Sequence, residues 1–311
     1  MNDDLSRSLA AAQGTCAAHA HSLGELPPLT RASGASEGEE DVRTAKRLRL
    51  RRAAVAARAN ASTKSGLITL GRVGLYRDQG VVLRTIKLGE ADRIVTILTQ
   101  VNGKIRAVAK GVRKTGSRFG ARLEPTRHVA LQCYRGRELD VVTQVETIDA
   151  FRRIREDYGL LTHAISMLEA TDQVAQERQR NLALYRMLVG ALRTLDSRPS
   201  PVIAAAFFWK LLSLEGFHPM LDGCARCGAE SQPLVALDLV EGGALCEDCA
   251  RLGGRRVSPE ALATLGMIVN DNLRQVLAGP PPADVLEEVE RLAIDAVEFH
   301  SERRLRSAAL L

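Results

Sequence analysis

From residue 75 onward, apolar and polar positions alternate with the period of β-strands. Such segments cover residues 81–86, 94–98, 104–110, 129–133 and 139–145. In the third segment, one face would be buried and the other would carry Lys104, Arg106 and Lys110. The Asn102-Gly103 pair before it is a strong signal for a hairpin turn. Five strands within about 75 residues predict a small closed barrel. The OB-fold is the first candidate, and an SH3-like barrel would give a similar pattern.

From residue 151 the apolar period becomes helical. Leu161, Ile165 and Leu168 share one helical face, and further amphipathic segments follow at 185–195, 203–214, 262–276 and 289–299. Ser258 before Pro259 is a typical helix start, and Asp284 is expected to cap the last helix. The pattern therefore predicts an α+β protein: an N-terminal five-stranded OB-fold barrel followed by an α-helical domain.

The first 73 residues follow neither pattern. They contain no aromatic residue and no sustained apolar period, so they cannot bury enough surface to offset the entropy of ordering. We expect a disordered basic extension at 1–73, an OB-fold DNA-binding domain at 74–150 and a helical domain at 151–311.

The three segments differ in net charge. The net charge is +4 over residues 1–73, +6 over 74–150 and −4 over 151–311. A polyanion is the natural partner of such a basic first half.

The loop after the third predicted strand concentrates this charge. Between residues 110 and 122 it holds basic residues and no acidic one, together with Phe119. Cations beside an aromatic ring on a barrel suit single-stranded nucleic acid, because the cations follow phosphates and the ring stacks on a base. The alternative is a solvated basic loop with the ring tucked into the barrel end. The predicted DNA contacts are Lys104, Arg106, Lys110, Arg113, Lys114, Arg118, Phe119 and Arg122.

Four cysteines form two C-x-x-C pairs separated by eighteen residues: Cys224, Cys227, Cys246 and Cys249. This spacing is typical of a closed four-thiolate zinc site, which is structural because no coordination position remains for water. We expect one structural zinc ion per chain, held by knuckles at about 222–254 inside the helical domain. Two buried disulfides or four separate core thiols are the alternatives.

Several classes are disfavoured. The chain has no phosphate-binding loop with a terminal Lys-Ser/Thr, no dinucleotide-binding glycine motif, no nucleophile elbow and no H-E-x-x-H. We therefore expect a binding protein and not an enzyme. No apolar stretch approaches the length of a membrane span and no secretory signal is visible. We expect a reducing, cytoplasmic setting close to the nucleoid.

Several local motifs occur in an order that resembles one known family. They are the segment 88–95, Gly103, the run 109–114 with Ser117, the four cysteines and the closing Arg303-Arg304-Leu305. Over about residues 75–306 the chain resembles the bacterial DNA repair proteins of the RecO family. Residues 1–73 have no counterpart in that pattern.

The resemblance implies a function. Members are recombination mediators that bind single- and double-stranded DNA and anneal complementary strands. They act with RecR, recognise the acidic tail of single-stranded DNA-binding protein (SSB), and help load RecA onto SSB-coated strands. The alternative is a zinc-ribbon and OB-fold factor that acts in RNA metabolism or transcription.

Overall fold

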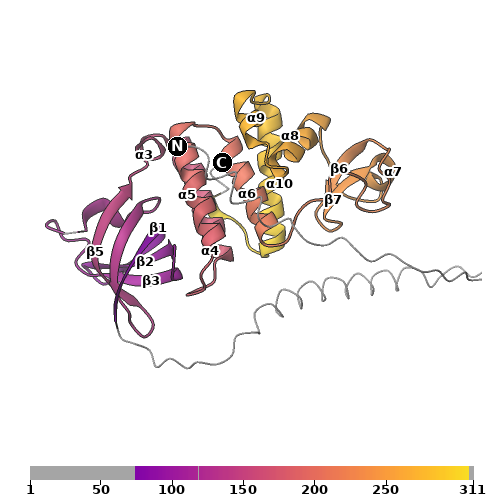
Figure 1. Ribbon diagram of the computed structural model, residues 1–311. Helices are drawn as coiled ribbons and strands as arrows, with labels where there is room; N and C mark the ends of the chain where they lie inside the picture. The colour runs from indigo at the N-terminus through magenta and orange to yellow at the C-terminus, as the bar shows by residue number, and fades with distance from the viewer. Residues whose placement is uncertain (1–73, 118, 308–311) are drawn as a thin grey trace, which may run out of the picture. The chain divides into compact units, whose positions relative to one another are not determined.

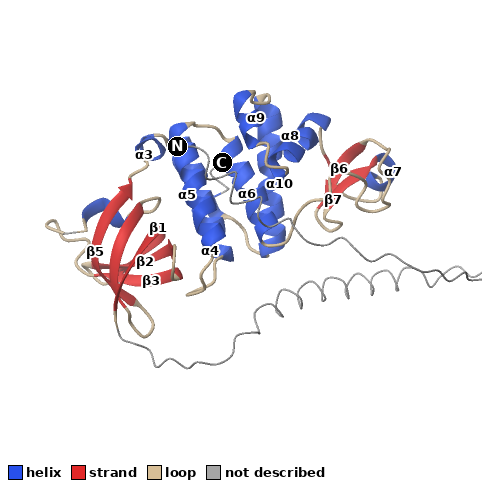
Figure 2. Ribbon diagram, in the orientation of Figure 1, coloured by secondary structure: helices blue, strands red, loops and turns tan. Residues whose placement is uncertain are grey.

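The computed structural model describes residues 74–117 and 119–307. The sequence-based prediction for residues 1–73 therefore lies outside the described part, as does Arg118. The described chain begins with a barrel, continues into helices and carries a small sheet between two of them (Figures 1 and 2).

Five strands close the barrel: β1 (Leu75–Leu88), β2 (Asp92–Thr99), β3 (Gly103–Ala109), β4 (His128–Tyr134) and β5 (Asp140–Asp149). Their order around the barrel is β1-β2-β3-β5-β4, and only the β3–β5 pairing is parallel. This is the Greek-key order of the OB-fold, so the first candidate is confirmed over the SH3-like alternative.

Strand β1 is longer than its sequence pattern indicates because it pairs with different neighbours along its length. Its first half pairs with β4 and its second half with β2. Both pairings meet at Gly80, where a Cβ atom would lie 2.5 Å from Ile97 Cγ2. A side chain at Gly80 would therefore disrupt the crossing.

The barrel core follows the predicted alternation. Strand β3 is buried at every second residue, including Ile105, Ala107 and Ala109. These side chains pack with Val82, Ile97 and other apolar residues inside the barrel.

The helical part is organised around α6 (Val202–Leu214), whose residues from Val202 to Trp209 are all buried. Four helices pack on α6: α4 (Tyr158–Val174), α5 (Leu182–Ser197), α8 (Pro259–Val269) and α10 (Ala283–Ser301). The shorter helices are α3 (Arg152–Glu156) and α9 (Leu273–Ala278). The small sheet comprises β6 (Leu234–Asp238), β7 (Gly243–Cys246) and β8 (Arg255–Arg256), with α7 (Glu247–Ala250) beside it. No helix in the described part of the chain is long and apolar enough to cross a membrane.

The helix starts agree only in part with the sequence. Ser258 caps α8, and its side chain accepts from the backbone N–H of Ala261. The prediction for Asp284 is wrong, because α10 begins one residue earlier and no side chain caps it.

The barrel and the helical part are joined by His128 of β4, which is 2% exposed. Its Nδ1 lies 2.7 Å from Asp149 Oδ2, and its Nε2 lies 2.8 Å from the hydroxyl oxygen of Tyr185 on α5. Because the carboxylate only accepts, Nδ1–H donates to Asp149 and Nε2 accepts from Tyr185 in the neutral ring. Burial lowers the pKa of His128 and outweighs the hydrogen bond to Asp149, which raises it.

We expect the free energy of unfolding to fall as the pH drops below about 6.5, the usual pKa of histidine in an unfolded chain. The folded pKa of His128 is lowered, so the unfolded chain takes up the proton first. The stability that the neutral His128 ring contributes to the folded state is thus present above that pH and lost below it. Urea unfolding of wild type and His128→Gln between about pH 5 and 8 measures this, and the variant should show a flatter dependence.

His163→Gln is the control of opposite sign. Burial lowers the pKa of His163, but Glu290 at 3.1 Å raises it, and the net direction is upward. Its contribution is therefore present below about pH 6.5 and lost as the pH rises through the folded pKa. Equal pH dependence in wild type and His128→Gln would contradict the assignment.

Candidate nucleic-acid interface and metal centre

The four predicted metal ligands converge on one point. Their sulfur atoms all lie within 4.8 Å of one another, and Cys227 Sγ is 3.8 Å from Cys246 Sγ. All four are free thiols, so the structure supports the cluster over two disulfides or separate core thiols. The first pair lies between α6 and β6, Cys246 ends β7, and Cys249 lies in α7.

The backbone around the first pair forms a tight turn. The Gly228 N–H donates to the Cys224 carbonyl at 2.8 Å, and Gly228 has a φ of +75°. That φ favours glycine over residues with a Cβ. The turn therefore sets the course of the backbone that carries both thiols.

The ionisation of these thiols indicates what the cluster can hold. Burial raises the pKa of Cys224, but backbone N–H groups of Cys227, Cys246 and Arg226 oppose it and lower the pKa to about 6. Burial and the neighbouring thiols raise the pKa of Cys249 to about 12. All four thiolates can coexist only if a cation compensates their charge, which a thiolate-bound metal ion does. The donor set thus fits a closed metal site.

The basic loop packs on the β1–β2 turn. Its backbone is held by Gly111 N–H, which donates to Asp92 Oδ1 at 2.7 Å, and by Arg113 N–H, which donates to the Ala91 carbonyl at 3.0 Å. Lys110, Arg113 and Lys114 are exposed. The loop is therefore anchored through its backbone and through Arg113 Nη1, which donates to the Gly89 carbonyl at 3.2 Å, while the three cationic side chains remain exposed.

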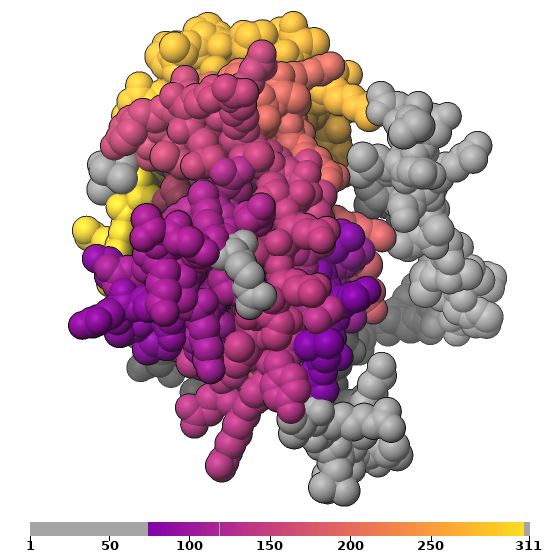
Figure 3. All heavy atoms as spheres, turned by 90° about the vertical axis from the view of Figure 1, so that its left-hand side faces the viewer, coloured from indigo at the N-terminus to yellow at the C-terminus, as the bar shows by residue number. Residues whose placement is uncertain are grey.

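Sequence reasoning missed Lys87, which is exposed near the end of β1. Lys87 pairs with Arg93, which in turn pairs with Ala109, the residue before Lys110. The only signal in the sequence is its position just before the turn. We call Lys87, Lys110, Arg113 and Lys114 the barrel-end cluster; Figure 3 views the molecule from the barrel side. Arg122 is also exposed, at the end of η2 (Gly120–Leu123).

Two predicted DNA contacts on β3 face the helical part instead. Lys104 Nζ lies 3.1 Å from Asp172 Oδ1, and the Lys104 side chain is 12% exposed. Arg106 Nη1 lies 3.9 Å from Glu177 Oε1. The structure therefore separates these two cations from the barrel-end cluster and gives them acidic partners.

Phe119 lies inside the barrel. It is 5% exposed and packs with the barrel core, so the second of the two sequence-based alternatives describes it. The ring has no free face for a base in this structure, and we correct the stacking assignment accordingly.

The fold and these sites define a class of protein: an OB-fold barrel with an exposed basic end, followed by a helical part with a four-thiol metal site. The family model described as "Recombination protein O N terminal" matches residues 73–151. The model described as "Recombination protein O C terminal" matches residues 155–309. The chain therefore belongs to the RecO family.

Two curated relatives agree with this assignment, and both are called "DNA repair protein RecO". The protein of Frankia casuarinae is 42% identical over 241 residues, which are 76% of this chain and 98% of the relative. The protein of Bifidobacterium longum subsp. infantis is 43% identical over 243 residues, which are 77% of this chain and 99% of the relative.

Phe119→Ala should lower the free energy of unfolding by about 3–5 kcal/mol, because it leaves a cavity in the barrel core. Urea denaturation measures this change. Tyr158→Ala is the matched control: Tyr158 is 70% exposed, so its loss should change stability by no more than about 0.5 kcal/mol. A Phe119→Ala protein as stable as this control would show that the ring does not belong to the core.

Proposed function

We propose that this protein is a recombination mediator in DNA repair. It binds single- and double-stranded DNA, anneals complementary strands, and acts with RecR to load RecA onto SSB-coated single strands. Family membership supports this proposal, as do the names of the two relatives. The observation that carries it is the barrel-end cluster, an exposed group of cations on a fold that commonly binds nucleic acid.

In this proposal DNA lies on the barrel end. Lys110, Arg113 and Lys114 contact phosphates, Lys87 joins them, and Arg118 and Arg122 extend the contact. Lys104 and Arg106 are already paired with carboxylates, so they contribute less. Phosphate contacts carry no sequence information, which suits a protein that must accept any strand.

The helical part is proposed to hold protein partners, namely RecR and the acidic tail of SSB. The proposed mediator acts by competitive binding, which needs no covalent step. We therefore propose no enzymatic activity. It would take place in the cytoplasm, at the nucleoid. We retain the division into 1–73, 74–150 and 151–311 as part of the proposal.

The metal ion is proposed to be one Zn²⁺ per chain, because four thiolates in a tetrahedral site favour zinc. It would join the small sheet and α7 to the segment between α6 and β6 that carries the first cysteine pair. It would take no part in DNA chemistry. Its role is therefore structural.

Freshly purified protein should contain one zinc per chain by elemental analysis. Cys227→Ser should lose the metal and most of the stability of the helical part, since closed thiolate sites contribute about 10–16 kcal/mol of apparent folding free energy. Cys16→Ser removes a cysteine outside the cluster and should retain the metal. Wild-type protein without any metal would refute the site.

Changing Arg113 and Lys114 together to Ala should weaken binding to single-stranded DNA similarly for all sequences. If both residues contact phosphates, the slope of log K against log salt should flatten by about 1.4 units, at about 0.7 per contact. Fluorescence anisotropy at several salt concentrations measures affinity and slope together.

The matched control for this experiment is Arg186→Ala with Arg274→Ala, which removes the same charge from exposed sites on α5 and α9. Wild-type affinity and slope in the loop variant would exclude the barrel end as the interface. A clear preference of the wild-type protein for RNA would instead favour a role in RNA metabolism.

A further inference from the structure

The segment that follows α10 is held to the helical part by its backbone. Leu305 and Ser307 are 3% and 5% exposed. Glu169 of α4 accepts from the N–H groups of Arg306 and Ser307, at 3.0 and 2.9 Å, and from the Ser307 hydroxyl at 2.5 Å. The Leu305 N–H donates to Glu298 at 2.8 Å. The segment is therefore anchored without using its arginine side chains.

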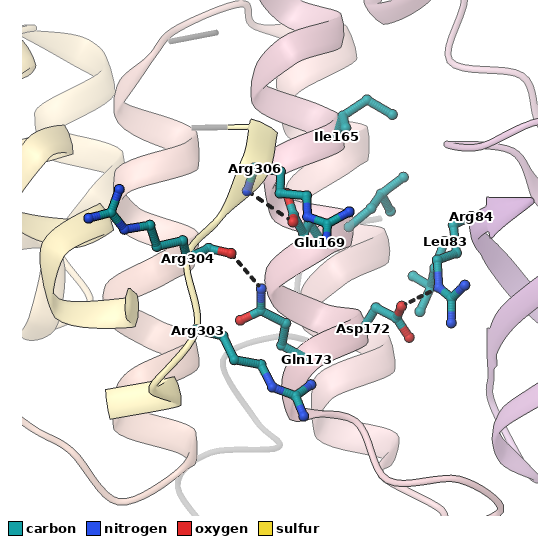
Figure 4. Close-up of a pocket in the computed structure, with 10 residues that line it drawn as sticks. Leu83, Arg84, Ile165, Glu169, Asp172, Gln173, Arg303, Arg304 and Arg306 are labelled. Carbon is teal, nitrogen blue, oxygen red and sulfur yellow. Dashed lines mark hydrogen bonds and ion pairs between the residues drawn. The ribbon is translucent and has the colours of Figure 1, made fainter. Parts of the chain in front are cut away.

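Three guanidinium groups remain on this anchored segment: those of Arg303, Arg304 and Arg306, all exposed. Within residues 74–117 and 119–307, none of them has a carboxylate partner. The one bond at Arg304 uses its carbonyl, which accepts from Gln173 Nε2 at 3.3 Å. Figure 4 shows Arg303 and Arg306 extending toward the side of Arg84, whereas Arg304 extends the other way.

These arginines border a cavity of about 740 Å³ between β1, α4 and the C-terminal segment. Its apolar lining is Leu83, Ile165 and Leu168. The carboxylates that line it are already engaged: Glu169 by the backbone, and Asp172 by Arg84 at 2.6 Å and Lys104 at 3.1 Å. The cavity thus presents unpaired positive charge over an apolar floor.

Strand β1 connects this cavity to the barrel-end cluster. Arg84 lines the cavity, and Ile86 and Leu88 follow at alternate positions with exposures of 46% and 38%. Leu88 precedes Gly89, whose carbonyl accepts from Arg113 at 3.2 Å. Four strand residues span about 13 Å, so a few nucleotides would bridge the two basic sites.

We propose that this cavity is a second phosphate-binding site, occupied by the same single strand that binds the barrel end. The inference rests on the proposed DNA-binding function and extends it. Phosphates are held by Arg303 and Arg306, whose planar forks suit bidentate contact with phosphate oxygens, whereas Arg304 extends away from the cavity. Ile86 and Leu88 lie between the two sites as an apolar surface for bases. A strand is favoured over an acidic peptide because the cations continue along β1 to a second basic site.

The test uses full-length protein and oligothymidylates of about 4 and about 16 nucleotides, the two ends of the site size of such barrels. Changing Arg303 and Arg306 together to Ala should weaken binding of the longer strand and flatten its salt slope by about 1.4 units, two contacts' worth at about 0.7 each. Binding of the shorter strand, which just reaches from one basic site to the other, should weaken less and lose less of its salt slope. Arg186 and Arg274, both exposed, changed together to Ala form the charge-matched control, which should match wild type on both strands.

The variant Glu169→Ala distinguishes the role of Glu169 in positioning the C-terminal segment from the effect of its negative charge. Loss of a carboxylate beside the cavity would strengthen DNA binding if only charge mattered. Because Glu169 anchors the segment that carries the arginines, we expect weaker binding of the longer strand instead. Thermal unfolding of each variant confirms that the fold is retained.

Any of four results would overturn the proposal. The first three are a double variant with wild-type affinity and slope on the longer strand, a charge-matched control whose binding weakens equally, and stronger binding by Glu169→Ala. The fourth is an arginine variant that loses binding to a labelled acidic peptide but keeps DNA binding. That result would assign the cavity to a protein segment. If wild-type protein binds neither strand, the proposed DNA-binding function itself is refuted. That outcome differs from the four above, in which wild-type protein still binds DNA.

Discussion

Asp172, near the C-terminal end of α4, determines which cations of the barrel remain available. Its carboxylate contacts both Arg84 and Lys104, and the aspartate side chain is 19% exposed. Ion pairs with limited solvent access are screened less than pairs on an open surface. The contact therefore joins β1 and β3 to the helices and offsets part of the positive charge on the side of the barrel that faces them. Glu169, one helical turn earlier, fixes the C-terminal segment through backbone N–H groups and leaves that segment's arginines unneutralised. Residues on one face of α4 thus pair some basic residues in structural contacts and leave others available to a ligand.

A related constraint governs the small sheet. The apolar cluster around the cysteines contains few buried residues besides the thiols themselves, among them Ala236 and Leu245. Such a cluster buries too little apolar surface to be stable alone. Backbone donors favour ionisation of Cys224, whereas burial and the neighbouring thiols oppose ionisation of Cys249. A bound cation would reverse that opposition, so the stability of this sheet and the occupancy of the thiol cluster are coupled.

The sequence predicts features that depend on local pattern and spacing. The alternation in β3, the convergence of the cysteines and the Ser258 cap all follow from residues a few positions apart, or from ligand chemistry that requires proximity. The partners of Lys104 could not be predicted in this way. Alternation places Lys104 on the outer face, but Asp172 is 68 positions away, and only the packing of α4 on the barrel brings them together. Phe119 is a similar case, because a loop pattern does not say whether a ring covers the barrel core or faces solvent. Asp284 carried the right residue type for a cap, but α10 begins at the residue before it.

The burial of Phe119 also bears on how the proposed DNA contact would behave. An exposed aromatic ring adds stacking that persists at high salt, whereas phosphate contacts weaken steeply as salt increases. With Phe119 in the core, the exposed groups along the proposed track are mainly cations and the aliphatic side chains of Ile86 and Leu88, with Glu90 in the turn between β1 and β2. Aliphatic contacts are non-directional, and each phosphate contact can form or break independently of its neighbours. A strand held in this way can be displaced stepwise by a competitor that takes one phosphate at a time. The proposed transfer of the strand to another protein would require this property, and a deeply stacked strand would oppose it.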